Sequence, residues 1–234
     1  MDPEDPNPTA ARPKMHVDPA LELEFPGLQV VELLVRGLAV RTSEARLEAL
    51  KARIYEETRK SGKTLETVKD DRLFKAYRDF YWRVGIDPTK TRPAAEALTR
   101  RVLGGKEIPT INTLVDACNL VSLKTSIPIA AFDCAHLRPE ALHFRRARAG
   151  ESFLGIGMSH PVLLEGIEAV IEDTDHHDLA AVYPFRNAER SKVTGSTQEA
   201  FLLMCGVPGI DNRQLEGAKA LCREFAAEFC APTP

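Results

Sequence analysis

Three short polar side chains share one face of a predicted helix and are the first candidates for chemistry. Asn112, Asp116 and Asn119 fall at i, i+4 and i+7, which places them within a narrow arc if the chain is helical from residue 113 to 124. Taken alone, this spacing favours a helix cap followed by an ordinary solvated face. Against that, the stripe carries no Lys, Arg or Glu before Lys124. Short amides and a carboxylate are groups that hold a water molecule or an amino group in a structured site.

A second polar group begins with residues 183–187, which read Tyr-Pro-Phe-Arg-Asn. A turn with cationic and hydroxyl side chains, running into a helix N-terminus, can hold a phosphate or a carboxylate. A hairpin followed by a well-capped helix explains the same pattern equally well. The side chains concerned are Arg186, Asn187, Ser191, Lys192, Thr194, Ser196 and Thr197.

Metal and cofactor chemistry find little support in the sequence. Residues 175–178 read Asp-His-His-Asp, but neighbouring residues seldom point at one ion, so we interpret them as a solvated acidic loop. Nucleophile-elbow, phosphate-loop and dinucleotide-binding motifs do not occur. The sequence therefore predicts no metal and no cofactor.

Charge is distributed unevenly along the chain. The formal net charge is −3, yet residues 83–106 contain six Lys/Arg and two Asp/Glu, a local +4. Residues 161–190 contain seven Asp/Glu and two Arg, a local −5. A phosphate-binding face on the basic side is therefore permitted, although the net charge argues against bulk electrostatic binding of nucleic acid.

Composition indicates a globular protein of the cytoplasm. Hydrophobic residues make up 44% of 234 and charged residues 28%, and the most apolar stretch, residues 28–40, is interrupted by Glu32, Arg36 and Gly37, so no membrane span is expected. Five cysteines without a Cys-x-x-Cys pair predict reduced, mostly buried thiols. We expect residues 1–26 to be a disordered or extended lead-in and residues 27–234 to form one domain with a C-terminal helix.

Periodicity predicts the elements that must position the polar residues. Helices are predicted after Ser43, over 67–84, after Thr91, after Asn112 and from Asp211. Strands are predicted over 28–40, 127–132, 142–147 and 180–186, with a turn at 187–190 and residues 191–194 pairing back. Residues 199–205 fit either a helix behind a capping box at 196–199 or a buried strand. Because helices and strands do not alternate regularly, the predicted class is α+β, with mixed or antiparallel sheets packed against helices.

Residues 111–133 read Ile-Asn-Thr-Leu-Val-Asp-Ala-Cys-Asn-Leu-Val-Ser-Leu-Lys-Thr-Ser-Ile-Pro-Ile-Ala-Ala-Phe-Asp. This stretch resembles the fused third and fourth (B-three/B-four) domain of the bacterial phenylalanyl-tRNA synthetase β subunit. The family pattern there is Ile-Asn, then Val-Asp, then an Asn, then a Pro leading to Ala-Phe-Asp. Residues 92–98 and 183–197 look like the free-standing branch of this family, and the resemblance extends over about residues 28–209.

The resemblance implies an activity. In the synthetase this domain is an editing domain, which hydrolyses the ester between a wrong amino acid and the terminal ribose of tRNA. The chain would then be a stand-alone deacylase that meets the aminoacylated 3′ end of tRNA in trans. An aminoacyl ester is already activated, so binding the terminus, placing a water and donating hydrogen bonds to the oxyanion can accelerate its hydrolysis without a strong nucleophile.

The resemblance also suggests roles for particular residues. Asn112, Asp116 and Asn119 would be catalytic residues that line the cleft, and Asp133 would be structural. The predicted substrate-binding residues are Ser122, Ala130, Arg186, Asn187, Lys192 and Thr194.

Two departures from the family pattern keep other functions open. Ala130 stands where the family often has a His, and the Gly-rich stretch that lines the synthetase pocket has no clear counterpart here. One alternative is a non-catalytic tRNA- or RNA-binding module with the editing-domain fold. The other is a hydrolase or binder of small amino-acid derivatives. The sequence does not specify an oligomeric state.

Overall fold

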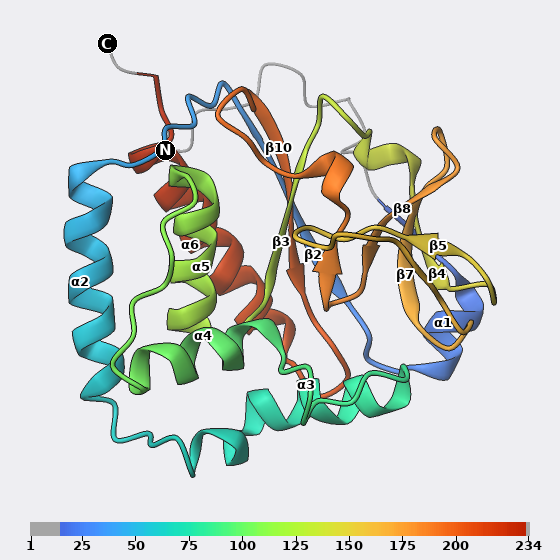
Figure 1. Cartoon of the computed structure of the whole chain (residues 1–234), viewed down its shortest axis with the longest axis horizontal. Helices are drawn as coiled ribbons and strands as arrows, with labels where there is room; N and C mark the ends of the chain where they lie inside the picture. Colours follow the sequence, from blue (N-terminus) through green and yellow to red (C-terminus); the bar gives the residue numbers. More distant parts are fainter. Residues whose placement is uncertain (1–14, 233–234) are drawn as a thin grey trace.

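A computed structural model of the chain describes residues 15–232. Its centre is a three-stranded antiparallel sheet in the order β2-β10-β3 (Figure 1). The middle strand pairs along its whole length with β2 and over most of its length with β3. The strands are β2 (Val30–Arg36), β10 (Glu199–Cys205) and β3 (Ile129–Asp133).

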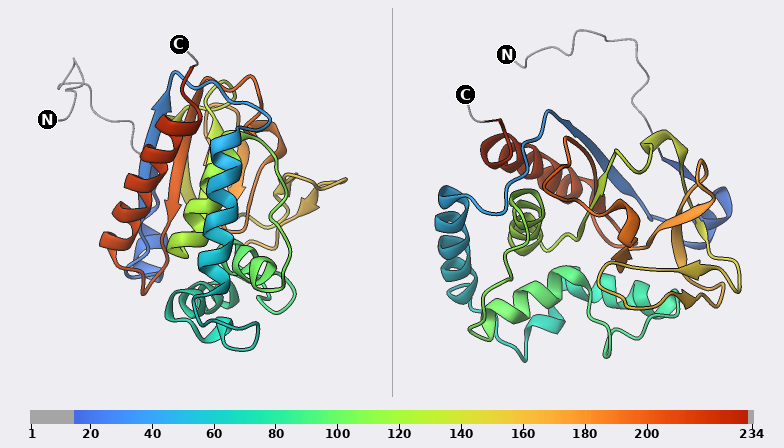
Figure 2. Two further views of the ribbon diagram at one scale, coloured as in Figure 1. Left: turned by 90° about the vertical axis from the view of Figure 1, so that its left-hand side faces the viewer. Right: turned by 45° about the horizontal axis from the view of Figure 1, so that its top comes forward.

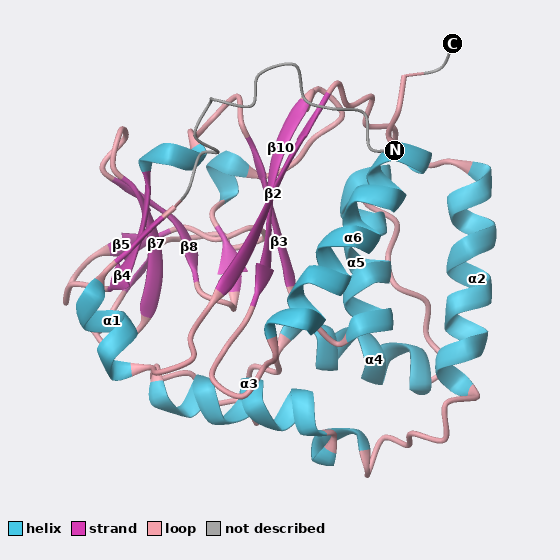
Figure 3. Cartoon of the chain, turned by 180° about the vertical axis from the view of Figure 1, so that it is seen from behind, coloured by secondary structure: helices cyan, strands magenta, loops and turns pink. Residues whose placement is uncertain are grey.

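A helical layer covers one side of this sheet (Figures 1 and 3). Helices α5 and α6 pack against each other and contact β3 and β2 respectively, and α2 and α4 pack on the outer side of α5. Helix α3 runs past the end of the sheet and is preceded by the short turn η1. The bounds are α2 (Ala45–Arg59), η1 (Val68–Asp70), α3 (Arg72–Arg83), α4 (Ala94–Leu103), α5 (Thr113–Thr125) and α6 (Asn212–Phe229).

A five-stranded sheet in the order β1-β4-β7-β8-β9 forms the other half of the molecule. Strand β1 is parallel to β4 and the other neighbours are antiparallel. The hairpin β5-β6 projects from the body (Figure 2, left). The bounds are β1 (His16–Val17), α1 (Pro19–Glu24), η2 (Pro139–Ala141), β4 (Leu142–Arg146), β5 (Ser152–Phe153), β6 (Val162–Leu163), β7 (Ala169–Asp173), β8 (Asp178–Val182), β9 (Arg186–Asn187) and η3 (Glu189–Ser191). The class is α+β, as predicted.

Local sequence signals explain most helix boundaries. Asn112 caps α5, because its Oδ1 accepts from the Val115 N–H at 3.0 Å, a contact that contributes about 1 kcal/mol in helices of this kind. Asp211 and Gln214 form a capping box at the start of α6. Helix α3 ends at Arg83, and Gly85, which follows the C-cap residue Val84, has a φ of 74° that favours glycine.

The two halves are joined at the end of β10. Tyr77 of α3 donates to the carbonyl of Cys205 at 2.6 Å, and Tyr183 donates to the carbonyl of Gly206 at 2.5 Å. Both phenols are at most 1% exposed. The carbonyls of Cys205 and Gly206, at the end of the central strand, thus accept hydrogen bonds from opposite halves of the fold. These buried bonds fix the two halves relative to each other.

Residues 15–26, predicted as part of a disordered or extended lead-in, are folded. They form β1 and α1, with Met15, Leu21 and Phe25 each at most 2% exposed. Asp18 caps α1 through the Ala20 N–H, and Pro19 occupies the first helical position, where a missing N–H costs nothing. Residues 1–14 of the predicted lead-in lie outside the described residues.

After residue 183, the structure decides between the two alternatives left open for residues 199–205 and corrects the prediction for residues 191–194. Residues 199–205 are a strand and not a helix, because β10 lies between two other strands and is covered on both faces. Residues 191–194 do not pair back; the short strand that pairs with β8 is β9, and η3 follows it.

All five cysteines are free, and four are buried, which confirms the prediction of mostly buried thiols. Burial raises the pKa of Cys205 to about 12, so its reactive thiolate is scarce at neutral pH. Within residues 15–232, no helix combines the length and the apolar character that crossing a membrane requires.

Candidate functional site at the open edge of strand β3

The two polar segments singled out in the sequence meet in the structure. Residues 111–133 supply α5 and β3, and residues 183–197 supply β9 and the loop after it. Three hydrogen bonds join them: Asn112 Nδ2 to the Val193 carbonyl (3.3 Å), Asn187 Nδ2 to the Ala131 carbonyl (3.0 Å) and Thr197 Oγ1 to Asp133 Oδ2 (2.7 Å). We call this junction the β3 seam.

Asn112 and Asp133 hold the seam together. Asn112 uses its Oδ1 to cap α5 and its Nδ2 to bind Val193. Asp133 is buried and accepts from Thr197 and from the Ala135 N–H at 2.9 Å. These contacts support the structural role expected for Asp133, and they make Asn112 a buried positioning residue, 6% exposed, whose Oδ1 and Nδ2 each bind within the protein.

Asp116 does not line a cleft, contrary to the expectation. Its side chain is 1% exposed, and Oδ2 accepts from Lys51 Nζ of α2 at 2.6 Å. Its Oδ1 accepts from the Ile111 N–H at 3.0 Å. With both oxygens occupied inside the protein, Asp116 ties α5 to α2 and has no contact to offer a substrate.

Lys51 is the buried partner that the sequence reasoning missed. Burial alone would lower the pKa of Lys51, but hydrogen bonds to Asp116 and Glu48 outweigh it and the pKa is raised. Lys51 therefore stays charged at neutral pH. A signal was available, because Lys51 lies four residues after Leu47 and three before Ile54, on the apolar stripe of its helix.

Asn119 is the member of the polar stripe that a ligand can use. It is half-buried, and its amide makes no hydrogen bond with any residue in the range 15–232. Its helix, α5, packs directly on β3. Ser122, one turn further along, is buried at 3% exposure.

The backbone of β3 offers a free donor at the seam. In an antiparallel ladder both polar groups of a residue point to the same side. The Ala131 carbonyl binds Asn187 on the side away from β10, so the Ala131 N–H also points away from β10. No residue of the described range accepts from it, and residues 129–131 are only half-buried.

The remaining predicted residues make contacts of different kinds. Arg186 donates to the Ile156 carbonyl at 2.6 Å and lies over the Phe185 ring. Lys192 pairs with Glu189 at the surface. Thr194 Oγ1 and Ser196 Oγ lie 2.8 Å apart. Ala130 contributes only a half-buried methyl group.

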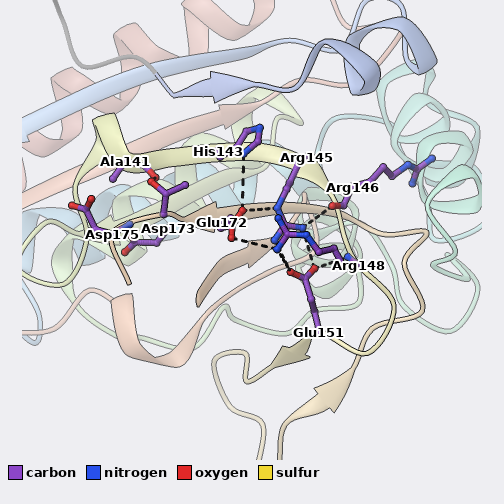
Figure 4. A network of polar contacts seen from close by, with 10 residues as sticks. Ala141, His143, Arg145, Arg146, Arg148, Glu151, Glu172, Asp173 and Asp175 are labelled. Carbon is purple, nitrogen blue, oxygen red and sulfur yellow. Dashed lines mark hydrogen bonds and ion pairs between the residues drawn. The ribbon is translucent and has the colours of Figure 1, made fainter. Parts of the chain in front are cut away.

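A charged network lies elsewhere, in the five-stranded sheet (Figure 4). Arg145, 4% exposed, binds both oxygens of Glu151 at 3.0 and 2.5 Å and one oxygen of Glu172 at 2.6 Å. It also donates to the Arg146 carbonyl. Every carboxylate here has a cation, so the network anchors the segment before β5 to β4 and β7.

Two cavities open in the helical half of the molecule, and none of the predicted site residues lines either one. One, of about 210 Å³, lies between α2, α4 and the end of α5. The other, of about 550 Å³, lies on the outer side of α4.

Comparison with known proteins identifies the family. The model of the B3/4 domain matches residues 76–219, more than half of the chain, from α3 into α6. The chain belongs to the B3/4 domain family. The matched range includes the whole β3 seam.

Curated relatives of this B3/4 domain are β subunits of phenylalanine–tRNA ligase. The subunit from Symbiobacterium thermophilum is 32% identical over 119 residues, 51% of this chain and 13% of that protein. The subunit from Bdellovibrio bacteriovorus is 37% identical over 94 residues, 40% of this chain and 11% of that protein. The similarity to each thus spans only a small part of the relative.

A solved structure supports the fold. An N-terminal fragment of the phenylalanyl-tRNA synthetase β subunit from Pyrococcus horikoshii matches with a TM-score of 0.51 and 13% identity, over 92% of this chain and 48% of that chain. At this identity the match concerns the fold alone.

Proposed function

We propose that this B3/4 domain hydrolyses the ester of aminoacyl-tRNA in trans, at the open edge of β3. The observation that carries the proposal is the free Ala131 N–H beside the Asn187 amide, at a junction built from both polar segments. The substrate class comes from the relatives, which are subunits of ligases that join phenylalanine to tRNA.

The chemistry requires few groups. Water attacks the ester carbonyl carbon, the bond to the ribose oxygen breaks, and the proton from water ends on that ribose hydroxyl. The oxyanion accepts a hydrogen bond from the Ala131 N–H, while the amides of Asn119 and Asn187 orient the water and the α-amino group. One oriented oxyanion donor contributes about 10²–10³-fold in other acyl-transfer enzymes.

Neutral donors give this mechanism a characteristic pH dependence. The seam groups proposed to touch the substrate are amides and a backbone N–H, which do not titrate near neutral pH. Attack therefore depends on hydroxide or on the weak nucleophile water. We expect the catalysed rate to rise steadily with pH between about 6 and 8, without the bell shape that an acid and a base produce.

The decisive experiment measures deacylation of a panel of tRNAs, each charged with correct and incorrect amino acids, against spontaneous hydrolysis. Selective loss of particular misacylated pairs is expected. The sharpest variant is Ala131→Pro, which removes the free N–H and no ladder bond, because proline is tolerated at an edge strand. We expect about 10²-fold slower deacylation with the fold retained.

Two controls separate catalysis from folding. Ala131→Ser keeps the N–H and should stay within a fewfold of the unsubstituted chain. Ala130→Pro removes an N–H from the ladder with Leu203 and should destabilise the fold instead. Full activity in a folded Ala131→Pro variant would overturn the role of the N–H.

A second candidate function is a tRNA-binding module without turnover. The observation that favours it is Ala130, a methyl group where the family often has a His. A flat deacylation panel, together with tRNA binding that weakens steeply with salt, would establish this function in place of the first.

A further inference from the structure

The 550 Å³ cavity on the outer side of α4 is lined by four cationic side chains and no carboxylate. Its walls come from α4, from the loop before η1 and from the chain on either side of α4. The lining residues are Leu65, Arg92, Ala97, Arg100, Arg101, Gly104 and Lys106. We call this cavity the α4 pocket.

Two of the four cations are held in place by the fold. Arg100 donates to Glu96 at 2.8 Å and to the Leu65 carbonyl at 2.7 Å. Arg101 donates to the Glu107 carbonyl at 2.6 Å. A guanidinium fixed through some of its donors presents the remaining N–H groups at low entropic cost.

The buried Glu96 does not neutralise the pocket. Its carboxylate is fully buried and also accepts from Arg78 of α3 at 3.2 Å. Arg78 therefore balances the charge of Glu96, and the charge of Arg100 remains available on the pocket side.

The other two cations have no partner among residues 15–232. Arg92 and Lys106 are exposed, and their side chains make no hydrogen bond or ion pair with any residue in the described part of the chain. An apolar wall from Leu65 and Ala97 completes the lining. Such a surface suits a nucleic-acid strand. The cations can bind its phosphates, and guanidinium planes can also stack on its bases.

We propose that the α4 pocket binds the phosphodiester backbone of the tRNA that the β3 seam deacylates. The inference rests on the proposed function for the identity of the RNA. It explains how a chain with a net charge of −3 holds a polyanion: the positive charge is concentrated where the backbone passes.

The test compares two double variants with the same loss of charge. Arg92→Gln/Lys106→Gln alters the pocket, and Arg213→Gln/Arg223→Gln alters exposed positions of α6. Binding of fluorescently labelled uncharged tRNA is measured by anisotropy between 50 and 300 mM salt. The pocket variant should bind about tenfold more weakly at 100 mM salt, with a salt slope lower by about one for each phosphate that is no longer neutralised. The α6 variant should match the unsubstituted chain.

A second measurement separates this inference from the deacylase proposal. With full-length aminoacyl-tRNA the pocket variant should show a raised KM and an unchanged kcat, whereas an aminoacylated oligonucleotide of the last few nucleotides should be hydrolysed equally by all variants. If no protein deacylates tRNA but the two double variants still differ in tRNA binding, the binding role of the α4 pocket is retained and the deacylase proposal is rejected. Equal tRNA affinity and salt slope in all three proteins, or no tRNA binding at all, overturns the pocket.

Discussion

The β3 seam and the Arg145 network are both polar, but their groups are satisfied to different degrees. In the network, Arg145 meets Glu151, Glu172 and a backbone carbonyl (Figure 4). At the seam, the Ala131 N–H has no partner among residues 15–232, and the same holds for the Asn119 amide on α5. Of these two regions, the charged one is saturated, and spare hydrogen-bonding capacity lies in the neutral one.

The contrast indicates how structure and binding are divided in this fold. A saturated buried network has no donor left for a ligand, and removing one member leaves another charge uncompensated. A neutral group at a half-buried edge costs little when unpaired, because water reaches it in the free protein. Strong charge inside the domain therefore indicates a structural role here, and the conspicuous carboxylate Asp116 follows the same rule.

Removing Arg145 should have the largest effect. Arg145→Met leaves Glu151 and Glu172 with only the exposed Arg148 as a cation, at 3.4 and 3.8 Å, and we expect a loss of about 3–5 kcal/mol in the free energy of unfolding, measured with urea. Arg148→Met is the matched control: its side chain is 68% exposed, and it should cost less than about 1 kcal/mol. A loss below about 1 kcal/mol in Arg145→Met would contradict the structural role of the network.

The second prediction concerns Asp116. Asp116→Ala removes the buried carboxylate that faces Lys51 and leaves only Glu48, whose side chain is 43% exposed, as its ion-pair partner, so we expect about 3 kcal/mol lower stability. The double variant Lys51→Met/Asp116→Leu replaces the pair with apolar groups and should recover most of that loss. If Asp116→Ala instead keeps its stability and loses deacylation, Asp116 is a catalytic residue and its purely structural role is contradicted.

Asn119 should show the opposite pattern. Asn119→Ala removes a side chain without internal partners, so unfolding should change by less than about 0.5 kcal/mol. Deacylation should fall about tenfold to a hundredfold through lost positioning. The neighbouring surface variant Lys124→Ala serves as control and should leave the rate unchanged. Equal rates for Asn119→Ala and the control would remove Asn119 from the site.

The smallest effect is the pH dependence of stability. A hydrogen bond from Arg145 lowers the pKa of Glu172 against the opposing effect of burial. For Glu151, burial acts most strongly and would raise the pKa, but hydrogen bonds from Arg145 and the Arg148 N–H outweigh it, so the pKa is lowered. A lowered folded pKa gives stability that is complete above the ordinary value of 4.5 and is lost as the pH falls through the folded value. Urea unfolding at several pH values between about 3 and 7 should show this decline, and Arg145→Met should flatten it.

The sequence predicted the elements better than the contacts between them. Local sequence signals placed the starts of α5 at Asn112 and of α6 at Asp211 correctly, since both depend on residues close in sequence. They could not show that Lys51, 65 residues away, covers Asp116, because periodicity defines a face and not its neighbour. The ambiguity at residues 199–205 had the same origin: a continuous apolar run fits a buried strand or a buried helix.

The free donor at Ala131 could not have been found from residue types. It is a backbone group, and its availability depends on the register of β3 against β10 and on the fact that β3 is an edge strand. The pocket on α4 was partly visible as the local charge of +4. The sequence could not show which of these cations are held by carbonyl and carboxylate groups and which are free.

An open strand edge is also a template on which a second polypeptide can add as a further strand. In this fold the edge is five residues long, and the Asn187 side chain occupies the Ala131 carbonyl that an incoming strand would need. We therefore expect the Asn187 amide to hinder the addition of a second copy of the chain at this edge. Replacing Asn187 with Ala should therefore produce concentration-dependent association, visible by light scattering, even where the fold itself is unchanged.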